Sequence, residues 1–254
     1  MNITGHSAIV TGGGSGLGEA VARELARLGA KVAVLDVNTT GAQRVAAEIG
    51  GLACTADITD TASLTAALDA AEAAHGTARI VMNIAGIGSA KRVVGKDGSP
   101  APMEDFERVV RVNLLGTYNV VRLTAARIAR LAPLEGGERG VMVMTASVAA
   151  FDGQVGQEAY SASKGGIVGM TLPLARDLAQ HGVRVCTIAP GLFETPLLKG
   201  LPEAVQQSLA ASIPFPPRLG RPQEFAELAA HIVSNGHLNG EVIRLDGALR
   251  MAPR

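Results

Sequence analysis

The chain has 254 residues with 23 basic and 23 acidic side chains, so it carries no net charge at neutral pH. A balanced charge excludes a strong overall field toward nucleic acid or an anionic membrane, and we expect neither as a partner. The length fits one large α/β domain, and 47% hydrophobic residues with 31 Gly and no Trp fit a packed core of helices and sheet with many tight turns.

Cysteine and histidine usage gives no sign of a disulfide framework or a metal site. Cys54 and Cys186 are too few and too far apart for a zinc module, so we interpret them as core thiols in a reducing compartment. The five histidines lack ligand spacing, and we predict no metal. No signal segment precedes the first predicted strand and no apolar run is long enough to cross a bilayer, so we expect a cytoplasmic protein.

Short strand-like runs alternate with longer helical patterns along the chain, which is typical of a parallel sheet covered by helices on both faces. Seven strands are predicted, over Ser7 to Val10, Lys31 to Leu35, Gly51 to Ala56, Arg79 to Asn83, Gly140 to Thr145, Val183 to Ala189 and Glu241 to Leu245. Helical patterns include Leu17 to Leu28, Thr61 to His75, Met103 to Leu131 and Ala159 to Gln180. We therefore predict a single-domain, Rossmann-like, doubly wound α/β fold over residues 1–254, with a dinucleotide-binding N-terminal half and a substrate loop near residues 190–217.

A glycine-rich turn, Thr11-Gly-Gly-Gly-Ser-Gly-Leu-Gly18, follows the first predicted strand. Gly12 allows the tight turn, Gly16 lets the backbone approach a phosphate closely, and Gly18 lets the new helix pack on the sheet. The N-terminus of that helix would face a pyrophosphate. The turn alone is a weak signal, because an ordinary strand-to-helix connection looks the same.

The acidic residue Asp36 adds weight to this interpretation, since it ends the second predicted strand. A carboxylate there can accept hydrogen bonds from the adenosine ribose hydroxyls. No Arg or Lys follows Asp36, and Ser15 occupies a turn position where a basic side chain would meet a 2′-phosphate. The pattern predicts NAD rather than NADP as the cofactor.

Ser147, Tyr160 and Lys164 form a second constellation. Lys164 lies one helical turn beyond Tyr160, so its ammonium shares a helix face with the phenol. At roughly 4 Å and an effective dielectric near 20, an attraction on the order of 4 kcal/mol would lower the tyrosine pKa toward about 7, which suits general acid–base catalysis. Ser147 follows a strand at its carboxyl end, where open α/β sheets bind ligands. A Tyr-x-x-x-Lys pair also arises by chance, but with the glycine-rich turn it predicts nicotinamide-dependent interconversion of an alcohol and a ketone.

Motifs along the whole chain resemble those of the short-chain dehydrogenases/reductases. They are T-G-x-x-x-G-x-G at Thr11 to Gly18, D-I at Asp57 and Ile58, N-x-A-G at Asn83 to Gly86, N at Asn113, S at Ser147, Y-x-x-x-K at Tyr160 to Lys164 and P-G-x-x-x-T at Pro190 to Thr195. Longer runs, such as S-V-A-A-F-D-G-Q-V-G-Q-E-A-Y-S-A-S-K-G-G and N-G-E-V-I-R-L-D-G-A-L-R-M, are similar to the type 2 3-hydroxyacyl-CoA dehydrogenases, also called type 10 17β-hydroxysteroid dehydrogenases. Ile84 departs from the family's N-N-A-G and removes one side-chain hydrogen bond.

The resemblance implies NAD-dependent oxidation of a 3-hydroxyacyl-CoA to its 3-oxoacyl-CoA. In it Tyr160 takes the hydroxyl proton, Ser147 orients the oxygen, Lys164 lowers the tyrosine pKa and binds the nicotinamide ribose, and Asn113 holds a water that links Lys164 to solvent. The implied cofactor set is Gly12, Ser15, Gly16, Leu17, Gly18, Asp36, Asp57, Ile58, Asn83, Ala85, Gly86, Tyr160, Lys164, Pro190, Gly191, Phe193 and Thr195. The implied substrate residues at the reacting end are Ser147, Gln157 and Tyr160.

The loop from Gly88 to Pro102 carries three cations, Lys91, Arg92 and Lys96. Their composition is that of an ordinary solvated loop, but beside a substrate cleft they could bind the phosphates of coenzyme A. The resemblance also implies a homotetramer with the helices near Met103 to Leu131 and Ala159 to Gln180 at one interface. Gly165, Gly166 and Gly169 would allow the close approach of a neighbouring subunit.

Alternatives of two classes stay open. The enzyme could be a 3-oxoacyl-carrier-protein reductase, which usually prefers NADPH and so fits Asp36 poorly, or a steroid or other secondary-alcohol dehydrogenase. A different class is a scaffold that binds a protein or RNA partner. The zero net charge and the intact Ser147, Tyr160 and Lys164 disfavour a scaffold as the sole role.

Overall fold

A computed structural model describes residues 1–200 and 202–253, and its centre is one seven-stranded sheet in the order β3-β2-β1-β4-β5-β6-β7. The strands are β1 (Ser7–Thr11), β2 (Lys31–Asp36), β3 (Leu52–Thr55), β4 (Ile80–Asn83), β5 (Gly140–Thr145), β6 (Val183–Pro190) and β7 (Val242–Leu245). All six neighbouring pairs are parallel. The predicted doubly wound fold is confirmed. The strand order reverses between β1 and β4, and ligands of such sheets bind at the carboxyl ends near that point.

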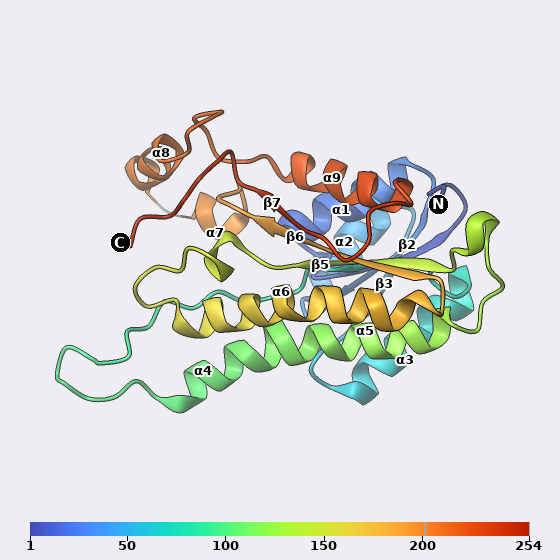
Figure 1. Ribbon diagram of the computed structural model, residues 1–254, viewed down its shortest axis with the longest axis horizontal. Coiled ribbons are helices and arrows are strands. Elements are labelled where there is room, and N and C mark those ends of the chain that lie inside the picture. The colour runs from blue at the N-terminus through green and yellow to red at the C-terminus, as the bar shows by residue number, and fades with distance from the viewer. Residues whose placement is uncertain (201, 254) are drawn as a thin grey trace.

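Helices cover both faces of the sheet, which is why its central strands are continuous apolar runs. They are α1 (Gly16–Arg27), α2 (Thr39–Ile49), α3 (Thr61–His75), α4 (Met103–Val110), α5 (Thr117–Ile128), α6 (Glu158–Ala179), α7 (Pro196–Lys199), α8 (Glu203–Ala211) and α9 (Pro222–Ser234), with short turns η1 (Arg111–Gly116), η2 (Glu135–Gly137) and η3 (Val148–Ala150). One core layer joins the sheet to α3, α5 and α6, and a second joins it to α1, α2 and α9. Figure 1 shows the two layers below and above the sheet.

The helix predicted over Met103 to Leu131 is helical without interruption from Met103 to Ile128, but its middle differs from a regular α-helix. A π-helical turn, η1, separates α4 from α5. The hydroxyl of Thr117 donates to the carbonyl oxygen of Asn113 at 2.7 Å inside this wider turn. Asn113 is completely buried as a result of its place there. Single π turns recur at functional sites, and their residues are ordinary helix formers that give no sequence signal.

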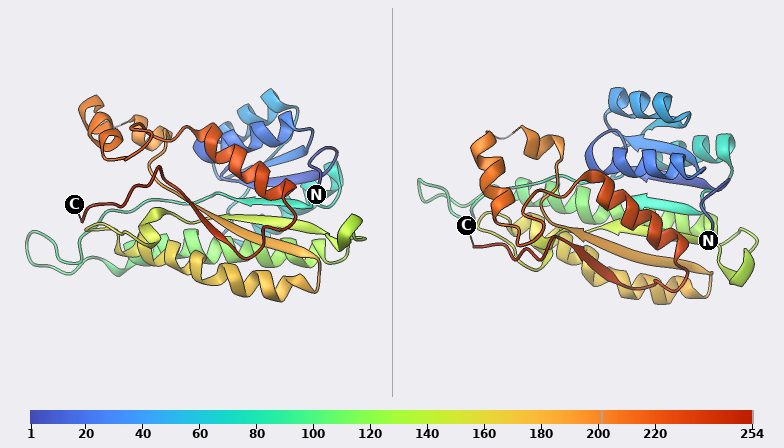
Figure 2. Two further views of the ribbon diagram at one scale, coloured as in Figure 1. Left: turned by 45° about the horizontal axis from the view of Figure 1, so that its top comes forward. Right: turned by 90° about the horizontal axis from the view of Figure 1, so that it is seen from above.

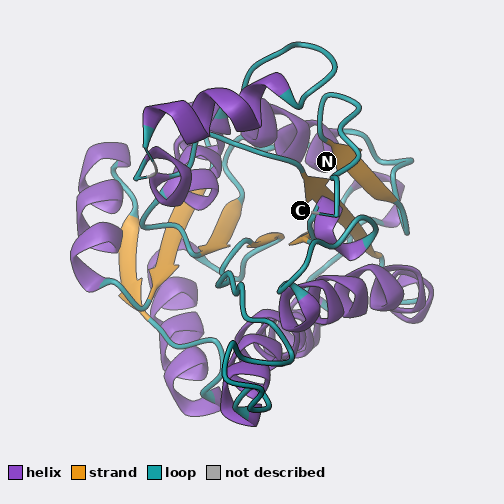
Figure 3. Cartoon of the chain, turned by 90° about the vertical axis from the view of Figure 1, so that its left-hand side faces the viewer, coloured by secondary structure: helices purple, strands orange, loops and turns teal. Residues whose placement is uncertain are grey.

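Two segments extend beyond the carboxyl ends of the strands, at the same end of the molecule. One is the loop of residues 88–102, and the other carries α7 and α8, which stand off from the sheet in Figure 2. Figure 3 views this end directly. In contrast to the central helices, α8 contains no buried residue. Among the described residues, no helix is long and apolar enough to cross a membrane.

Candidate active site

Ser147, Tyr160 and Lys164 converge just past the carboxyl end of β5. Ser147 follows the strand and caps η3, where its hydroxyl accepts a hydrogen bond from the Ala149 N–H at 3.1 Å. The Ser147 hydroxyl is also hydrogen-bonded to the phenol of Tyr160, which lies in the first turn of α6. One turn later, the Nζ atom of Lys164 donates to the carbonyl oxygen of Thr145 at 2.7 Å and lies 5.7 Å from the centroid of the Tyr160 ring. The three side chains thus form one connected group.

Burial is the largest influence on the pKa values of Lys164 and Tyr160. Lys164 is only 3% exposed, and desolvation lowers its pKa to about 8. Burial also raises the pKa of Tyr160, and the hydrogen bond from Ser147 opposes that shift only in part. The expectation that Lys164 lowers the tyrosine pKa toward neutrality is therefore wrong for this state of the protein. The interaction with Lys164 does not outweigh the desolvation of the phenol, because a buried site disfavours the charged form of both groups.

Asn113 joins this group from η1. We use the word crevice for the region at the carboxyl ends of the strands, where the segments that follow them meet. Its side-chain amide accepts from the Ile87 N–H at 2.8 Å and donates to the Ile87 carbonyl at 2.9 Å and to the Ser163 hydroxyl at 3.1 Å. A Cβ atom on Gly86 would lie 3.1 Å from Asn113 Oδ1 and 3.4 Å from Lys164 Nζ. Asn113 therefore fixes the chain after β4 against α6, and the glycine keeps the space beside the ammonium open.

The glycine-rich turn lies next to this group, at the carboxyl end of β1. A Cβ atom on Gly18 would lie 2.0 Å from the Gly12 carbonyl oxygen, and one on Gly12 would lie 2.8 Å from the main chain of Ala85. Ser15 is the N-cap of α1, yet its side chain makes no capping hydrogen bond. Leu17, in the first turn, packs against the core. The turn thus brings unpaired N–H groups at a helix N-terminus close to the crevice, which is the geometry that binds phosphate.

Asn83, at the end of β4, is the clearest sign that this crevice takes a polar ligand. The residue is 3% exposed, and neither its side-chain oxygen nor its nitrogen has a hydrogen-bond partner. The next two N–H groups, of Ile84 and Ala85, both donate to the Thr11 hydroxyl, at 3.1 and 3.3 Å. A buried amide without partners is costly and points to a missing partner. Together with the glycine cradle, it fits a dinucleotide.

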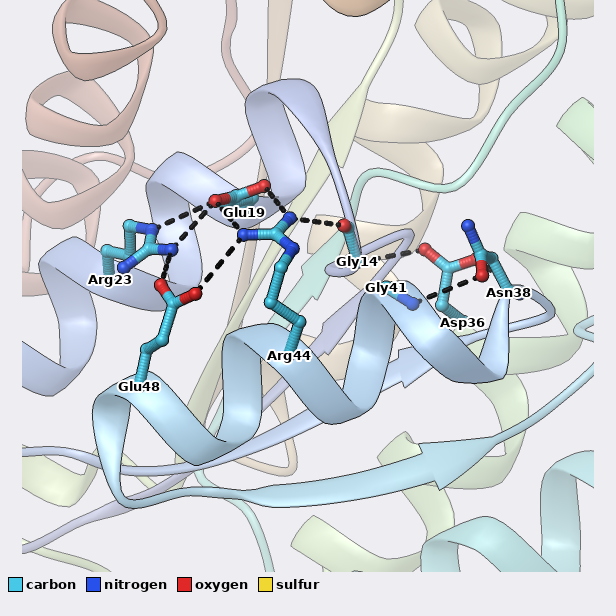
Figure 4. Close-up of polar contacts among 8 residues, drawn as sticks. All are labelled: Gly14, Glu19, Arg23, Asp36, Asn38, Gly41, Arg44 and Glu48. Carbon is cyan, nitrogen blue, oxygen red and sulfur yellow. Dashed lines mark hydrogen bonds and ion pairs between the residues drawn. The ribbon is translucent and has the colours of Figure 1, made fainter.

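Asp36 ends β2 on the other side of the turn. Its two carboxylate oxygens accept hydrogen bonds from the N–H groups of Gly14 and Asn38, each at 2.9 Å (Figure 4). Each oxygen keeps a further lone pair for a ribose hydroxyl. Farther along the crevice, Asp57 is exposed, while the side chain of Ile58 is buried. The side chain of Asp57 is thus accessible there, whereas that of Ile58 belongs mainly to the core.

The segment that follows β6 closes over the glycine-rich turn. Pro190 is the last residue of β6 and Gly191 begins the segment, and a Cβ atom on Gly16 would lie 3.8 Å from the Thr195 side chain. Phe193 differs from the other predicted cofactor residues. Its ring is buried and packs edge to face against a phenylalanine of α9, with the centroids 6.3 Å apart. Only the main chain of Phe193 is therefore placed to meet a cofactor.

The predicted cationic loop is attached to the turn that precedes α6. The Lys91 N–H donates to the Gly156 carbonyl at 2.8 Å, a few residues before Tyr160. The Lys91 ammonium forms an ion pair with Asp105. Arg92 and Lys96 are exposed and form no ion pair with any residue that the structure describes. The loop is thus tied to the turn before α6, and one of its three cations is partly neutralised.

The predicted residue Gln157 is the N-cap of α6. Its side-chain oxygen accepts from the Gln154 N–H at 3.0 Å, so it shapes the turn before α6. The Gln154 side chain donates to the Ala252 carbonyl at 2.9 Å, and Asp152 forms an ion pair with Arg244 at 2.5 Å. The C-terminal residues and the end of β7 thus hold the turn before α6 in place. Sequence reasoning did not identify these contacts, because they join segments about a hundred residues apart.

Sequence reasoning also missed a charged cluster that borders the glycine-rich turn. Figure 4 shows Glu19 and Arg23 on α1 facing Arg44 and Glu48 on α2. Arg44 contacts both Glu19 and the carbonyl oxygen of Gly14. The pairs within each helix have the visible spacing of four residues. The pairing between the helices depends on their packing, which no local pattern reveals.

Comparison with known proteins agrees with this geometry. The family model described as short chain dehydrogenase matches residues 6–206. The chain is 52% identical to the 3-hydroxyacyl-CoA dehydrogenase type-2 of Homo sapiens, over 99% of this chain and 98% of that protein. A crystal structure of 3-hydroxyacyl-CoA dehydrogenase type-2 from Mycobacterium avium superposes with a TM-score of 0.94 at 45% identity, covering 98% of both chains. A 3-ketoacyl-(acyl-carrier-protein) reductase from Brucella melitensis, complexed with NADH, gives a TM-score of 0.87 at 35% identity, over 98% of this chain and all of that one (100%).

The chain therefore belongs to the short-chain dehydrogenases. It is an oxidoreductase of that family, and a nicotinamide cofactor fits both the family and the crevice. No group of three or more His, Cys, Asp or Glu side chains within residues 1–200 and 202–253 is arranged to hold a metal ion.

Proposed function

We propose that the protein is an NAD-dependent 3-hydroxyacyl-CoA dehydrogenase that interconverts a 3-hydroxyacyl-CoA and its 3-oxoacyl-CoA, a reaction of fatty acid metabolism. The observation that carries this proposal is the hydrogen-bonded Ser147 and Tyr160 pair beside a buried Lys164, in a chain half identical to type-2 enzymes over its whole length. A bound nicotinamide supplies the hydride acceptor. The protein supplies the proton carrier and the position of the substrate.

The proton is carried by Tyr160. The Ser147–Tyr160 hydrogen bond marks where a substrate oxygen would bind, because each hydroxyl can instead turn to that oxygen. Ser147 orients the oxygen, and Tyr160 takes its proton during oxidation or returns it during reduction. Lys164, whose pKa is about 8, stays mostly charged at neutral pH, and its ammonium favours the phenolate formed during oxidation. Asn113 holds the chain after β4 in place beside these groups. The resemblance to the short-chain dehydrogenases implies that it also holds a water next to Lys164.

The cofactor preference rests on Asp36. Its carboxylate lies at the end of β2, and no cation among the described side chains is paired with it, so a 2′-phosphate would meet a like charge. The remaining cofactor contacts come from the glycine-rich turn, the chain after β4 and the segment of Pro190 to Thr195. NADH in the crystal of the reductase from Brucella melitensis supports the same choice.

Two features of the structure bear on the acyl-CoA substrate, a cavity beside β7 and the cationic loop. The segments that follow β6 and α8, together with the turn after β7, line a cavity of about 240 Å³, with Leu192, Ile213 and Leu245 among the lining residues. The charged residues Arg218, Glu224 and Asp246 also line it, and we propose that the apolar side chains hold the acyl group. We place the coenzyme A phosphates against the loop of residues 88–102, where the exposed side chains of Lys91, Arg92 and Lys96 would bind them. A 3-oxoacyl-carrier-protein reductase is the second candidate, since the Brucella melitensis relative carries that name.

Steady-state kinetics distinguish these candidates. The substrates are 3-hydroxyacyl-CoA esters of increasing chain length, the matching acyl-carrier-protein thioesters and a hydroxysteroid, each with NAD or NADH. We expect the largest kcat/KM for a CoA ester. A larger kcat/KM for the carrier-protein thioester or the steroid contradicts the proposed substrate.

We further propose a homotetramer that works in the cytoplasm. Exposed apolar side chains gather on α4, α5 and α6, namely Met103, Phe106, Tyr118 and Leu172. Gly165 and Gly169 on α6 leave open space where a second subunit fits, while Gly166 already packs against Leu114 within the chain. Free, buried Cys54 and Cys186 fit a reducing compartment. Light scattering at micromolar concentration should give the tetramer mass, and a monomer mass contradicts this assembly.

A further inference from the structure

The charged cluster beside the glycine-rich turn contains two arginines and two glutamates, from two helices. Arg44 of α2 forms a two-pronged ion pair with Glu19 of α1, at 2.9 and 2.6 Å. Arg23 pairs with Glu19 at 2.8 Å and with Glu48. The cluster is balanced in charge, and a two-pronged arginine–carboxylate pair fixes both partners in orientation as well as distance.

Arg44 differs from Arg23 in one respect. Its Nη2 atom also donates to the carbonyl oxygen of Gly14, at 3.2 Å. The N–H of the same glycine donates to the carboxylate of Asp36, at 2.9 Å. Gly14 is thus held from both sides, by Arg44 at its carbonyl and by Asp36 at its N–H (Figure 4). Gly14 therefore links the Arg44 guanidinium to the Asp36 carboxylate, which we propose as the ligand of the ribose hydroxyls.

An arginine in this neighbourhood commonly accommodates the 2′-phosphate of NADP in related folds. Arg44 is 47% exposed, so its long side chain has room to move if it is released. Glu19 holds it instead against the turn. Glu19 lies in the first turn of α1 and would otherwise present an uncompensated negative charge where phosphate is expected to bind.

We propose that the Glu19–Arg44 pair is a second determinant of cofactor choice. Glu19 keeps Arg44 on the Gly14 carbonyl, where the guanidinium positions the turn for NAD and cannot reach a 2′-phosphate. Arg44 is a positioning residue in the wild type and becomes a phosphate ligand once Glu19 no longer holds it. This inference rests on the proposed preference for NAD, and it assigns to two helices a selectivity that Asp36 alone would otherwise carry.

Direct binding tests the inference without turnover. Calorimetry measures the Kd of ADP-ribose and of 2′-phospho-ADP-ribose, the adenosine ends of NAD and NADP, for the wild type and each variant. Glu19→Gln should tighten binding of the 2′-phosphorylated ligand by about three- to tenfold and change ADP-ribose binding little. Arg44→Gln should weaken ADP-ribose binding by about threefold, because the turn loses one of its two holds. The double variant should lose the gain seen in Glu19→Gln.

Two variants are matched controls for charge. Glu48→Gln removes the same negative charge as Glu19→Gln, but Glu48 is farther from Arg44, at 3.6 Å. Arg23→Gln removes the same positive charge as Arg44→Gln, but Arg23 does not touch Gly14. Each should change both dissociation constants by less than about twofold. Thermal unfolding of every variant identifies any loss of fold.

The outcomes separate this inference from the proposed function. A wild type that binds the 2′-phosphorylated ligand more tightly overturns the NAD preference and this inference with it. A wild type that prefers ADP-ribose, with a Glu19→Gln variant that gains nothing, overturns this inference alone. A gain that persists in the double variant, or that Glu48→Gln reproduces in full, shows a general charge effect and also overturns it.

Discussion

The two ends of the crevice are built differently. At the nucleotide end, main-chain atoms are so close that a Cβ atom on Gly18 would lie 2.0 Å from the Gly12 carbonyl oxygen. At the substrate end, a Cβ atom on Gly88 would meet nothing within 4 Å, and α8 buries no residue. We therefore expect cofactor recognition to depend on fixed backbone geometry, and substrate recognition to depend on exposed side chains of segments that stand off from the sheet. Tyr160 and its neighbours lie between the two ends.

Loss of the proton carrier should have the largest effect. Tyr160→Phe removes the hydroxyl that meets the substrate oxygen and keeps the ring, so we expect kcat to fall by about 10³-fold or more. The Kd of NAD, measured by calorimetry, should stay near the wild-type value, because the nucleotide end is unchanged. A correctly folded variant that retains most of its turnover would rule out the role of Tyr160.

Paired alanine substitutions contrast the two ends directly. Gly18→Ala forces a methyl group onto the Gly12 carbonyl, and we expect a loss of about 3 kcal/mol in the free energy of unfolding, with weaker NAD binding. Gly88→Ala adds the same methyl group in open space, so its cost should be below about 0.5 kcal/mol. Urea denaturation of both variants makes the comparison. Equal losses would show that the two ends are packed alike.

The buried lysine should make stability depend on pH. The folded-state pKa of Lys164 is about 8, below its ordinary value of 10.5, so the folded protein binds fewer protons than the unfolded chain between these values. The free energy of unfolding should therefore rise with pH across this window, by up to about 3 kcal/mol from this group. Below pH 8 the full penalty for burying the charge is present. Lys164→Met should remove this rise, and a variant with the wild-type slope above pH 8 would contradict it.

The smallest expected effect belongs to the cationic loop. Replacing Lys91, Arg92 and Lys96 together by Gln should raise KM for the CoA ester by about tenfold and leave kcat for a small alcohol without CoA nearly unchanged. The control removes three exposed cations at the opposite end of the sheet, namely Lys31, Arg130 and Arg176. Unchanged KM in the loop variant would leave these cations as ordinary solvated charges. Equal losses on both substrates would assign the loop to folding or closure instead.

Sequence reasoning predicted most of the sheet, because central strands such as β5 are apolar throughout and are followed by glycine-rich or polar turns. It located the glycine-rich turn, Asp36 and the Ser147, Tyr160 and Lys164 group, since these positions follow strand ends or share a helix face. It missed the π-helical turn around Asn113, which has no distinctive composition. It also gave the wrong direction for the tyrosine pKa, because the degree of burial is a property of the packed site.

Contacts between segments that are distant in the chain could not be predicted from the sequence either. Arg44 lies eight residues beyond Asp36 and meets Glu19 only because α1 and α2 pack together, so the search for a cation directly after Asp36 did not find it. The tie from Gln154 to the C-terminal segment has the same origin. Local patterns report what one strand or helix does, whereas these contacts depend on where two elements cross.

The most direct test of the account is one comparison of kcat/KM for oxidation of 3-hydroxybutyryl-CoA with NAD, for the same ester with NADP, and for free 3-hydroxybutyrate with NAD. The account predicts that the first exceeds each of the others by about tenfold or more, because Asp36 repels a 2′-phosphate and the CoA moiety supplies binding energy far from the reacting carbon. A larger value with NADP, or an equal value for the free acid, would contradict it.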